Sequence, residues 1–228
     1  MAVNCEGGGR RRTTVVIVDD HPMLAAGLAE GLRRADFDAH IVEELSADAI
    51  VESVRRVDAD IVLLDLLLGD EVGDALPFIG PLADTGAQVF MLTGVTDERL
   101  LGACLEAGAS GVVRKASSLE AVVDQLGRAA EGSDASSHAE REDLLGTLRR
   151  HRVEERARLA PFDRLTPREG SVLGALMGGA SPQSIADDSG VSVATVRSQI
   201  RSILEKLGVH SQVAAVALAH RSGWAAPD

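Results

Sequence analysis

Five polar residues of this chain, each at the end of a short apolar run, have the side chains that phosphoryl chemistry needs. Carboxylate oxygens are preferred ligands of Mg²⁺, and a carboxylate can also act as the nucleophile that accepts a phosphoryl group. A lysine ammonium neutralises phosphate oxygens, and a threonine hydroxyl can donate a hydrogen bond to one. The runs at 15–18, 61–64, 89–92 and 112–113 lead to these residues, which are Asp19, Asp20, Asp65, Thr93 and Lys115.

The elements that must position these residues follow an alternating order from residue 14 to 131. Apolar runs typical of strands alternate with amphipathic stretches typical of helices, which predicts a parallel sheet with helices on both faces. The strands are apolar throughout, as expected for strands buried on both faces. We expect strands near 14–19, 38–43, 60–64, 88–92 and 111–114, and helices near 22–34, 47–56, 74–84, 97–107 and 118–131.

Five such units in one stretch fit a flavodoxin-like (βα)5 sheet with strand order 2-1-3-4-5. Ligands of this fold bind beyond the carboxyl ends of the strands, where the strand order reverses. In the expected order this point lies between the first and third strands, which lead to Asp19, Asp20 and Asp65. Asp65 stands alone after the most apolar central strand, so we predict that it is the nucleophile.

The composition places limits on the class of protein. A chain of 228 residues can form two domains, and no apolar run approaches the ~18 residues of a membrane span. The arginines at 10–12 precede an apolar run that is too short for a signal peptide. Cys5 and Cys104 do not form a disulfide framework. We therefore expect a cytoplasmic protein without a membrane partner, in which Cys104 is a small core residue.

The net charge of −12 is unevenly distributed along the chain. Residues 13–132 contain 22 acidic and 8 basic residues, whereas residues 161–228 contain 6 of each. The acidity therefore belongs to the first half, and the neutral C-terminal part can approach nucleic acid if its basic residues share a face.

The segment between the two halves has the composition of a linker. Residues 132–140 are polar and predict a hinge, and 141–159 read as a charged helix with few apolar positions. Its balanced charge indicates a solvated linker helix, while a short coiled-coil dimer seam remains the alternative. Residues 1–13, at the other end of the first domain, are expected to be disordered.

Residues 161–226 show repeated helix start signals. Thr166 and Glu169 form a capping box with a proline between them, and Ser181, Ser192 and Ser211 precede three further helical patterns. Gly190 falls in the turn between the second and third helices. Four short helices with this turn predict an all-α domain with a helix-turn-helix at about 181–200.

The third of these helices carries the residues best placed to read DNA. Its apolar positions fall on one face, and Arg197 and Arg201 lie four residues apart on the other side, beside the small residues Ala194, Ser198 and Ser202. Arginine reads guanine or binds phosphate. The alternative is a solvated face with two arginines. We predict DNA contacts from Thr195, Arg197, Ser198, Arg201 and Lys206.

The first half resembles the receiver domain of bacterial two-component response regulators, over about residues 14–131. The resemblance rests on the segments VVIVDDHPML (15–24), IVLLDLLLGD (61–70), MLTG (91–94) and GASGVVRKAS (108–117). It implies that a partner histidine kinase phosphorylates Asp65 and that Thr93 and Lys115 respond to the phosphoryl group. It also implies that Mg²⁺ is bound by Asp19, Asp20, Asp65 and the backbone carbonyl of Leu67.

Two positions depart from the receiver pattern. Val112 stands where such domains usually carry an aromatic residue that moves together with the threonine, which puts signal transmission in doubt. Leu67 and Leu68 replace the usual Met-Pro after the acceptor. Large apolar side chains there can slow the attack of water on the phosphoryl group, or they can be neutral variation in a loop.

The second half resembles the LuxR-type helix-turn-helix over about 162–220. The Leu-Thr-Pro-Arg-Glu start at 165–169, the Ile-Ala at 185–186, the Val-Ser-x-x-Thr-Val step at 191–196 and the Lys-Leu-Gly-Val end at 206–209 carry it. Arg197 and Gln199 stand where the family often has Lys and His, so base preference can differ. The resemblance implies that the helix at 211–220 forms a dimer surface.

Together the two resemblances imply a response regulator of the NarL/FixJ type that binds double-stranded DNA as a homodimer. It is expected to be no enzyme beyond its own phosphoryl transfer and dephosphorylation. The alternative is a phosphorylation-independent LuxR-type transcription factor whose receiver serves as a dimerisation module. A phosphatase is disfavoured, because Leu67, not a second carboxylate, stands two residues after Asp65.

Overall fold

A computed structural model describes residues 11–133 and 138–226. The chain divides after Arg149 into two compact units, each described here by itself. Across the described residues, no helix is both long and apolar enough to cross a membrane.

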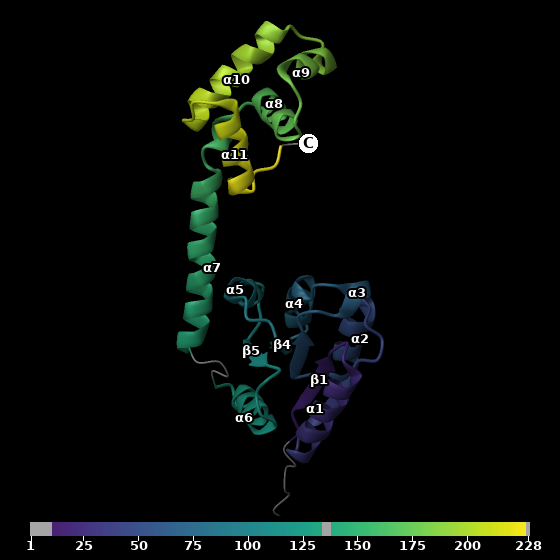
Figure 1. Ribbon diagram of the computed structural model, residues 1–228. Coiled ribbons are helices and arrows are strands. Elements are labelled where there is room, and N and C mark those ends of the chain that lie inside the picture. Colours follow the sequence, from purple (N-terminus) through teal and green to yellow (C-terminus); the bar gives the residue numbers. More distant parts are fainter. Residues whose placement is uncertain (1–10, 134–137, 227–228) are drawn as a thin grey trace, which may run out of the picture. The chain divides into compact units, whose positions relative to one another are not determined.

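The first unit is built on a five-stranded parallel sheet (Figure 1). Its order, β2-β1-β3-β4-β5, is the order expected from the sequence. The strand bounds are Thr14–Val18 (β1), Asp38–Ile41 (β2), Ile61–Asp65 (β3), Gln88–Thr93 (β4) and Gly111–Arg114 (β5).

Helices cover both faces of this sheet because successive side chains of a strand point to opposite faces. Val15, Ile17 and their neighbours pack under α1 and α6, whereas Val16, Val18 and theirs pack under α2, α4 and α5. The helix bounds are Pro22–Arg34 (α1), Ala47–Val57 (α2), Gly69–Val72 (α3), Leu76–Ala83 (α4), Glu98–Glu106 (α5) and Leu119–Ala130 (α6).

The linker helix α7, His138–Leu159, begins earlier than the sequence pattern predicted and is not solvated along its whole length. Its first half belongs to the first unit, where Leu144 and Leu148 are 4% and 7% exposed. Val153, further along, is 66% exposed. The expectation of a fully solvated linker helix is therefore wrong for its first half, because these leucines pack against the receiver unit.

The second unit is all helical, as predicted. Serine or threonine caps each of the helices α8 to α11 through side-chain bonds to the backbone, and Gly190 ends α9 in the left-handed conformation that glycine adopts without strain. Trp224 stacks on Phe162 with ring centroids 5.3 Å apart. The bounds are Phe162–Arg164 (η1), Pro167–Met177 (α8), Pro182–Ser189 (α9), Val193–Leu207 (α10) and Gln212–Ser222 (α11).

Two other expectations can be compared with the structure. The disordered segment was expected to run to residue 13, but Arg11 and Arg12 make ion pairs with Asp58 and Asp36. Residues 1–10, including Cys5, lie outside the described residues. Cys104 is fully buried, which confirms its place in the core.

Candidate functional site

The sheet register brings the predicted phosphoryl-site residues to one edge. Val18 pairs with Leu64, so the residues that follow them, Asp19 and Asp65, come side by side at the ends of β1 and β3. Thr93 pairs with Arg114, the residue before Lys115. All five side chains therefore stand at the carboxyl ends of adjacent parallel strands, where α/β sheets bind ligands.

Lys115 bridges two of the carboxylates. Its Nζ lies 2.6 Å from Asp65 Oδ2 and 2.9 Å from Asp19 Oδ2. The Asp19 side chain is fully buried, that of Asp65 is 6% exposed, and Lys115 itself is 20% exposed. These ion pairs are thus largely removed from water. In the protein interior an ammonium attracts a carboxylate more strongly than it does at the surface.

In the Lys115–Asp65 pair the pKa of each partner is raised above its ordinary value. Burial raises the pKa of Asp65 and outweighs the opposing effect of the hydrogen bond from Lys115, while the charge of Asp19 raises it further. Burial lowers the pKa of Lys115, but its bonds to Asp65 and Asp19 raise it by more, so the ammonium stays charged. A buried carboxylate beside a second carboxylate is stabilised when a bound cation offsets its charge.

The site has the donor set and the charge that suit a divalent cation. Asp19, Asp20, His21 and Asp65 each offer a ligand atom within 4.8 Å of the others. Lys115 neutralises one of the three carboxylate charges, and a divalent cation matches the remaining two. In the bridge between Leu67 and Asp74, the Leu66 carbonyl accepts from the Ala75 amide and the Gly73 carbonyl accepts from the Leu68 amide. The Leu67 carbonyl takes part in neither of these two bonds. The acidic cluster is therefore compatible with Mg²⁺.

His21 is a site residue that the sequence reasoning did not single out. Its Nδ1 lies 2.6 Å from Asp20 Oδ1 and 3.1 Å from Asp19 Oδ1, and its backbone N–H donates to Asp19. The sequence feature that could have identified it is its position directly after the two aspartates and just before the proline that starts α1.

The remaining predicted residues border an open cleft of about 740 Å³ beside Asp65. Thr93 is buried, and its Oγ1 accepts a hydrogen bond from the Val95 amide at 2.9 Å. Leu67 is 55% exposed at the cleft. Its side chain thus provides an apolar wall of the cleft beside Asp65. Slower hydrolysis of a phosphoryl group on Asp65 stays a prediction.

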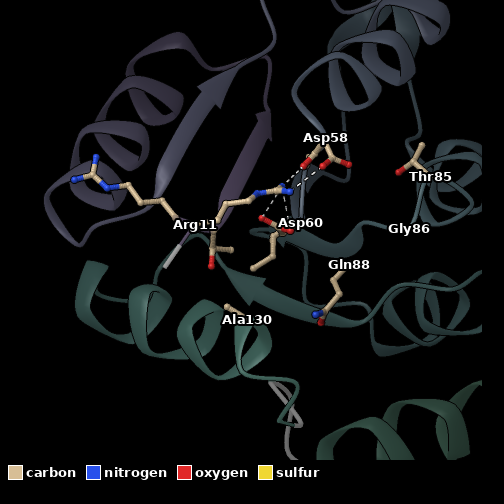
Figure 2. A pocket seen from close by; sticks show the side chains of 11 residues that line it. Arg11, Asp58, Asp60, Thr85, Gly86, Gln88 and Ala130 are labelled. Carbon is tan, nitrogen blue, oxygen red and sulfur yellow. Dashed lines mark hydrogen bonds and ion pairs between the residues drawn. The ribbon is translucent and has the colours of Figure 1, made fainter. Parts of the chain in front are cut away.

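A second cleft, of about 500 Å³, lies at the opposite edge, around the amino ends of the strands (Figure 2). There Arg11 donates to Asp58 Oδ2 at 2.8 Å and lies 3.3 Å from Asp60 Oδ2, and Asp60 also accepts from the Thr14 amide. The hydrogen bonds and charge of Asp58 and Asp60 raise the pKa of Arg11. The charges of Arg11, Asp58 and Asp60 thus offset one another. The same bonds attach the residues before β1 to the sheet.

The predicted DNA-reading residues lie on α10. Thr195, Arg197, Ser198 and Arg201 are all exposed, while Val196, Ile200, Ile203 and Leu207 are buried in the core of the second unit. The exposed side of the helix thus presents two arginines separated by one turn beside a short hydroxyl side chain, a surface that can approach a DNA groove.

Lys206, a predicted DNA contact, and Ser202, which was expected on the same side of the helix, differ from the other residues of α10 discussed above. Both reach Glu169 at the start of α8, with Ser202 Oγ 2.6 Å from Oε1 and Lys206 Nζ 2.6 Å from Oε2. Ser202 therefore faces α8 and not the DNA side, because residues four apart on a helix share a face with each other and here that face meets Glu169. The Lys206 ammonium has a structural partner in Glu169, whereas the other four predicted contacts are exposed, and all five stay predictions.

Glu169 is the centre of this cluster. The carboxylate is 8% exposed and also accepts bonds from the amide and hydroxyl of Thr166. Burial raises its pKa, but the bonds from Lys206, Ser202 and Thr166 outweigh this and lower it to about 2. The predicted capping box is thus confirmed, and it also fixes α10 against α8.

Comparison with known proteins agrees with this geometry. Residues 15–127 match the family model described as the response regulator receiver domain, and 163–219 match that of the bacterial regulatory proteins of the luxR family. The nitrate/nitrite response regulator protein NarP of Escherichia coli is 34% identical over 88% of this chain and 91% of its own length. The transcriptional regulatory protein YdfI of Bacillus subtilis is 30% identical over 90% of this chain and 94% of its own.

A solved structure of the RcsB response regulator from Salmonella typhimurium has the same fold. It has a TM-score of 0.50 at 24% identity, with 93% of this chain and 100% of that chain covered. The matched families account for both units, and the curated relatives span nearly the full chain. The chain belongs to the two-component response regulators of the NarL/FixJ type, with an N-terminal receiver domain and a C-terminal LuxR-type DNA-binding domain.

Proposed function

We propose that this protein is a DNA-binding transcriptional regulator controlled by phosphorylation of Asp65. The observation that carries the proposal is the arrangement at the sheet edge, where the Asp65 carboxylate faces an open cleft and is held by Lys115 at 2.6 Å. Such a carboxylate can attack a phosphoryl donor without any further chemical group from the protein.

The reaction transfers one phosphoryl group to the protein itself. An oxygen of Asp65 bonds to phosphorus as the bond from phosphorus to the donor breaks, either to the histidine nitrogen of a partner kinase or to the acetate oxygen of acetyl phosphate. Lys115 then pairs with the new phosphoryl oxygens, and Thr93 can donate its hydroxyl to one. Mg²⁺ bound by Asp19, Asp20, Asp65 and the Leu67 carbonyl would neutralise charge on the transferred group.

Phosphorylation at Asp65 favours the conformer that holds the phosphoryl group best, which is a shift of population. In that conformer two copies bind two DNA half-sites through Thr195, Arg197, Ser198 and Arg201. On α11, Val213 is 79% exposed and is available for a dimer contact. Apart from its own phosphorylation and dephosphorylation the protein catalyses no reaction. Because its target is DNA, we also propose a cytoplasmic location.

One experiment tests the acceptor. The intact protein is incubated with acetyl phosphate and Mg²⁺ and weighed by mass spectrometry, beside the Asp65→Asn variant, which keeps the size of the side chain. We expect one added phosphoryl group on the wild type and none on the variant. A wild type that gains no mass, or a variant that gains as much, contradicts the proposal.

A second experiment tests the DNA interface. Phosphorylated protein is titrated onto promoter DNA over a range of salt concentrations. The affinity should fall steeply with salt, and Arg201→Ala should weaken binding and flatten the slope if the arginine contacts phosphate. The matched control is Arg221→Ala, which removes a positive charge from the exposed end of α11 instead. Equal losses in both variants would argue against α10 as the reading helix.

A second candidate function is kept because of Val112. A phosphorylation-independent regulator would use the receiver only to dimerise, and the valine in place of an aromatic residue motivates this reading. The two candidates separate by dimerisation, measured by analytical ultracentrifugation with and without acetyl phosphate and Mg²⁺. A wild type that responds, together with an unresponsive Asp65→Asn variant, supports control by phosphorylation, whereas an unresponsive wild type supports the second candidate.

A further inference from the structure

The sheet of the first unit ends at β2, whose outer side forms an edge. The strand order places β2 outermost, with β1 as its neighbour on the inner side. The amides of Asp38 and Val42 donate to backbone carbonyls on the β1 side. Because the backbone groups of successive residues in a strand point to opposite sides, those of Ala39 and Ile41 point away from β1. The edge therefore presents backbone groups that a further strand would use.

The space beside this edge is open to solvent. A groove of about 300 Å³ runs along β2 between the helices α1 and α2, and Arg33, His40, Ile41, Ser53 and Arg56 are among the residues that line it. Ile41 is 36% exposed there, although it lies within the sheet. An accessible strand edge of this kind can pair with another extended chain by adding it to the sheet.

Arg33, in the last turn of α1, occupies part of the edge. Its Nε and Nη2 donate to the Ala39 carbonyl at 3.1 Å and 2.6 Å. Ala39 is 1% exposed despite its place on the outermost strand. The guanidinium thus covers a carbonyl that a partner strand would need, and its two charged donors bind that carbonyl more strongly than the single amide of a partner strand would.

Arg34, the next residue of the helix, has a different partner. Its guanidinium pairs at 3.0 Å with Glu30, four residues earlier on the exposed surface of α1. A basic residue near the C-terminal end of a helix is favourable at either position. The helix alone therefore does not explain why the Arg33 side chain reaches the strand edge instead of a neighbour on α1.

We propose that Arg33 blocks the β2 edge and so prevents this strand from pairing with β2 of a second copy of the chain. A second copy offers the same two outward residues in reverse order. In an antiparallel pair centred on His40, Ala39 of one copy lies opposite Ile41 of the other, and the Ile41 amide donates to the Ala39 carbonyl that Arg33 now holds. The proposal concerns the chain whether or not Asp65 is phosphorylated.

Self-association of the unphosphorylated full-length chain tests this proposal. Arg33→Met keeps the apolar stem of the side chain and removes its donors. Arg34→Met makes the same change of charge on the adjacent residue and is the matched control. Analytical ultracentrifugation over a range of concentrations gives the association constant of each protein. We expect Arg33→Met to associate about tenfold or more tightly than the wild type, the effect of one charge-assisted hydrogen bond, and Arg34→Met to match the wild type.

A second substitution identifies the surface that associates. Ile41→Pro removes the outward amide that the paired edge would use and leaves the bonds from β2 to β1 in place. Added to Arg33→Met, it should restore the association constant of the wild type. Circular dichroism checks that each variant is folded. Ile41→Lys, which places a charge at the edge, takes the place of the proline if that variant unfolds. Arg33→Lys, which keeps the charge without the two-pronged donor, takes the place of Arg33→Met and should associate to an intermediate degree.

Amide hydrogen exchange shows whether the edge is the contact. In Arg33→Met, exchange of the Ile41 amide should slow as the protein concentration rises, whereas in the wild type it should stay constant. Equal association constants in the wild type and in both arginine variants overturn the proposal. Tighter association that the changes at Ile41 do not reverse, or that leaves the Ile41 amide unprotected, places the contact elsewhere and also overturns it.

Discussion

The two buried ionic clusters of this molecule, one around Asp65 and one around Glu169, differ in how completely their charges are satisfied. At Asp65 the ammonium of Lys115 bridges two of three neighbouring carboxylates, and burial raises the acceptor's pKa. At Glu169 a single carboxylate accepts four hydrogen bonds, and its pKa falls to about 2. The first cluster keeps negative charge that a bound cation can offset, whereas the second is complete as it stands.

The difference teaches how to tell a functional ionic cluster from a structural one. Unbalanced buried charge destabilises the fold and persists only where a ligand compensates for it. A balanced cluster orients the elements that it joins, as Glu169 does for α8 and α10. Opposite effects on stability should therefore follow when one carboxylate is neutralised in each cluster.

The largest effect is expected from acid on the second unit. Because the Glu169 pKa is lowered from 4.5 to about 2 on folding, its contribution is complete above pH 4.5 and is lost as the pH falls toward 2. The full contribution is on the order of 3 kcal/mol. Trp224, the single tryptophan of the chain, lies in this unit and reports its unfolding by urea. The gap between wild type and Glu169→Gln should close at low pH, and a constant gap contradicts the assignment.

At neutral pH, Glu169→Gln should destabilise the second unit by about 2 kcal/mol, because it breaks a charge-assisted cluster and leaves Lys206 with a neutral partner. Urea unfolding followed by Trp224 fluorescence measures this. Glu205→Gln, at an exposed position of α10, is the matched control and should change little. If the two variants behave alike, Glu169 does not hold the helices together.

Asp20→Asn should act in the opposite direction on the first unit. Removing one of three neighbouring carboxylates relieves repulsion, so without Mg²⁺ the free energy of unfolding should rise by about 1 kcal/mol. The stabilisation by added Mg²⁺ should largely disappear. Circular dichroism during urea unfolding, with and without the metal ion, tests both points. Asp124→Asn, at an exposed position of α6, should show neither effect; a destabilised Asp20→Asn would mean that the cluster is balanced after all.

The smallest effect is expected at the opposite edge of the sheet. Arg11 pairs with Asp58 and Asp60 at exposed positions, and such pairs contribute little because water and salt screen them. Arg11→Ala should leave phosphorylation unchanged and alter stability only at low salt. A large loss of stability at high salt would show that this cleft, too, holds a necessary cluster.

The sequence predicted most of the first unit and the helix starts of the second because buried parallel strands and helix caps leave strong local signals. Strand order, the position of Asp65 and the caps at Thr166 and Ser192 all depend on such signals. The short helix α3 left none, since four residues contain barely one helical turn. The partners of Ser202 and Lys206 were missed because Glu169 lies more than thirty residues away in the sequence, and periodicity cannot tell a DNA side from a side that meets another helix.

The docked half of α7 was missed for a similar reason. Its leucines are sparse and its charges balanced, which is typical of a solvated helix, and the partner surface on α5 is created by the absence of a side chain at Gly102. Only the folded arrangement shows that a glycine inside a helix receives a second helix.

The thiol of Cys104, buried beneath α5, allows the opening of this part of the core to be measured chemically. It belongs to the same cluster as Leu144, and burial, together with the charge of Asp74, raises the pKa of its thiol to about 11. At neutral pH this sulfur is almost wholly protonated and shielded, so alkylating reagents reach it only during opening of the surrounding core. The rate of its alkylation thus reports how often this core opens, and no engineered label is needed to measure it.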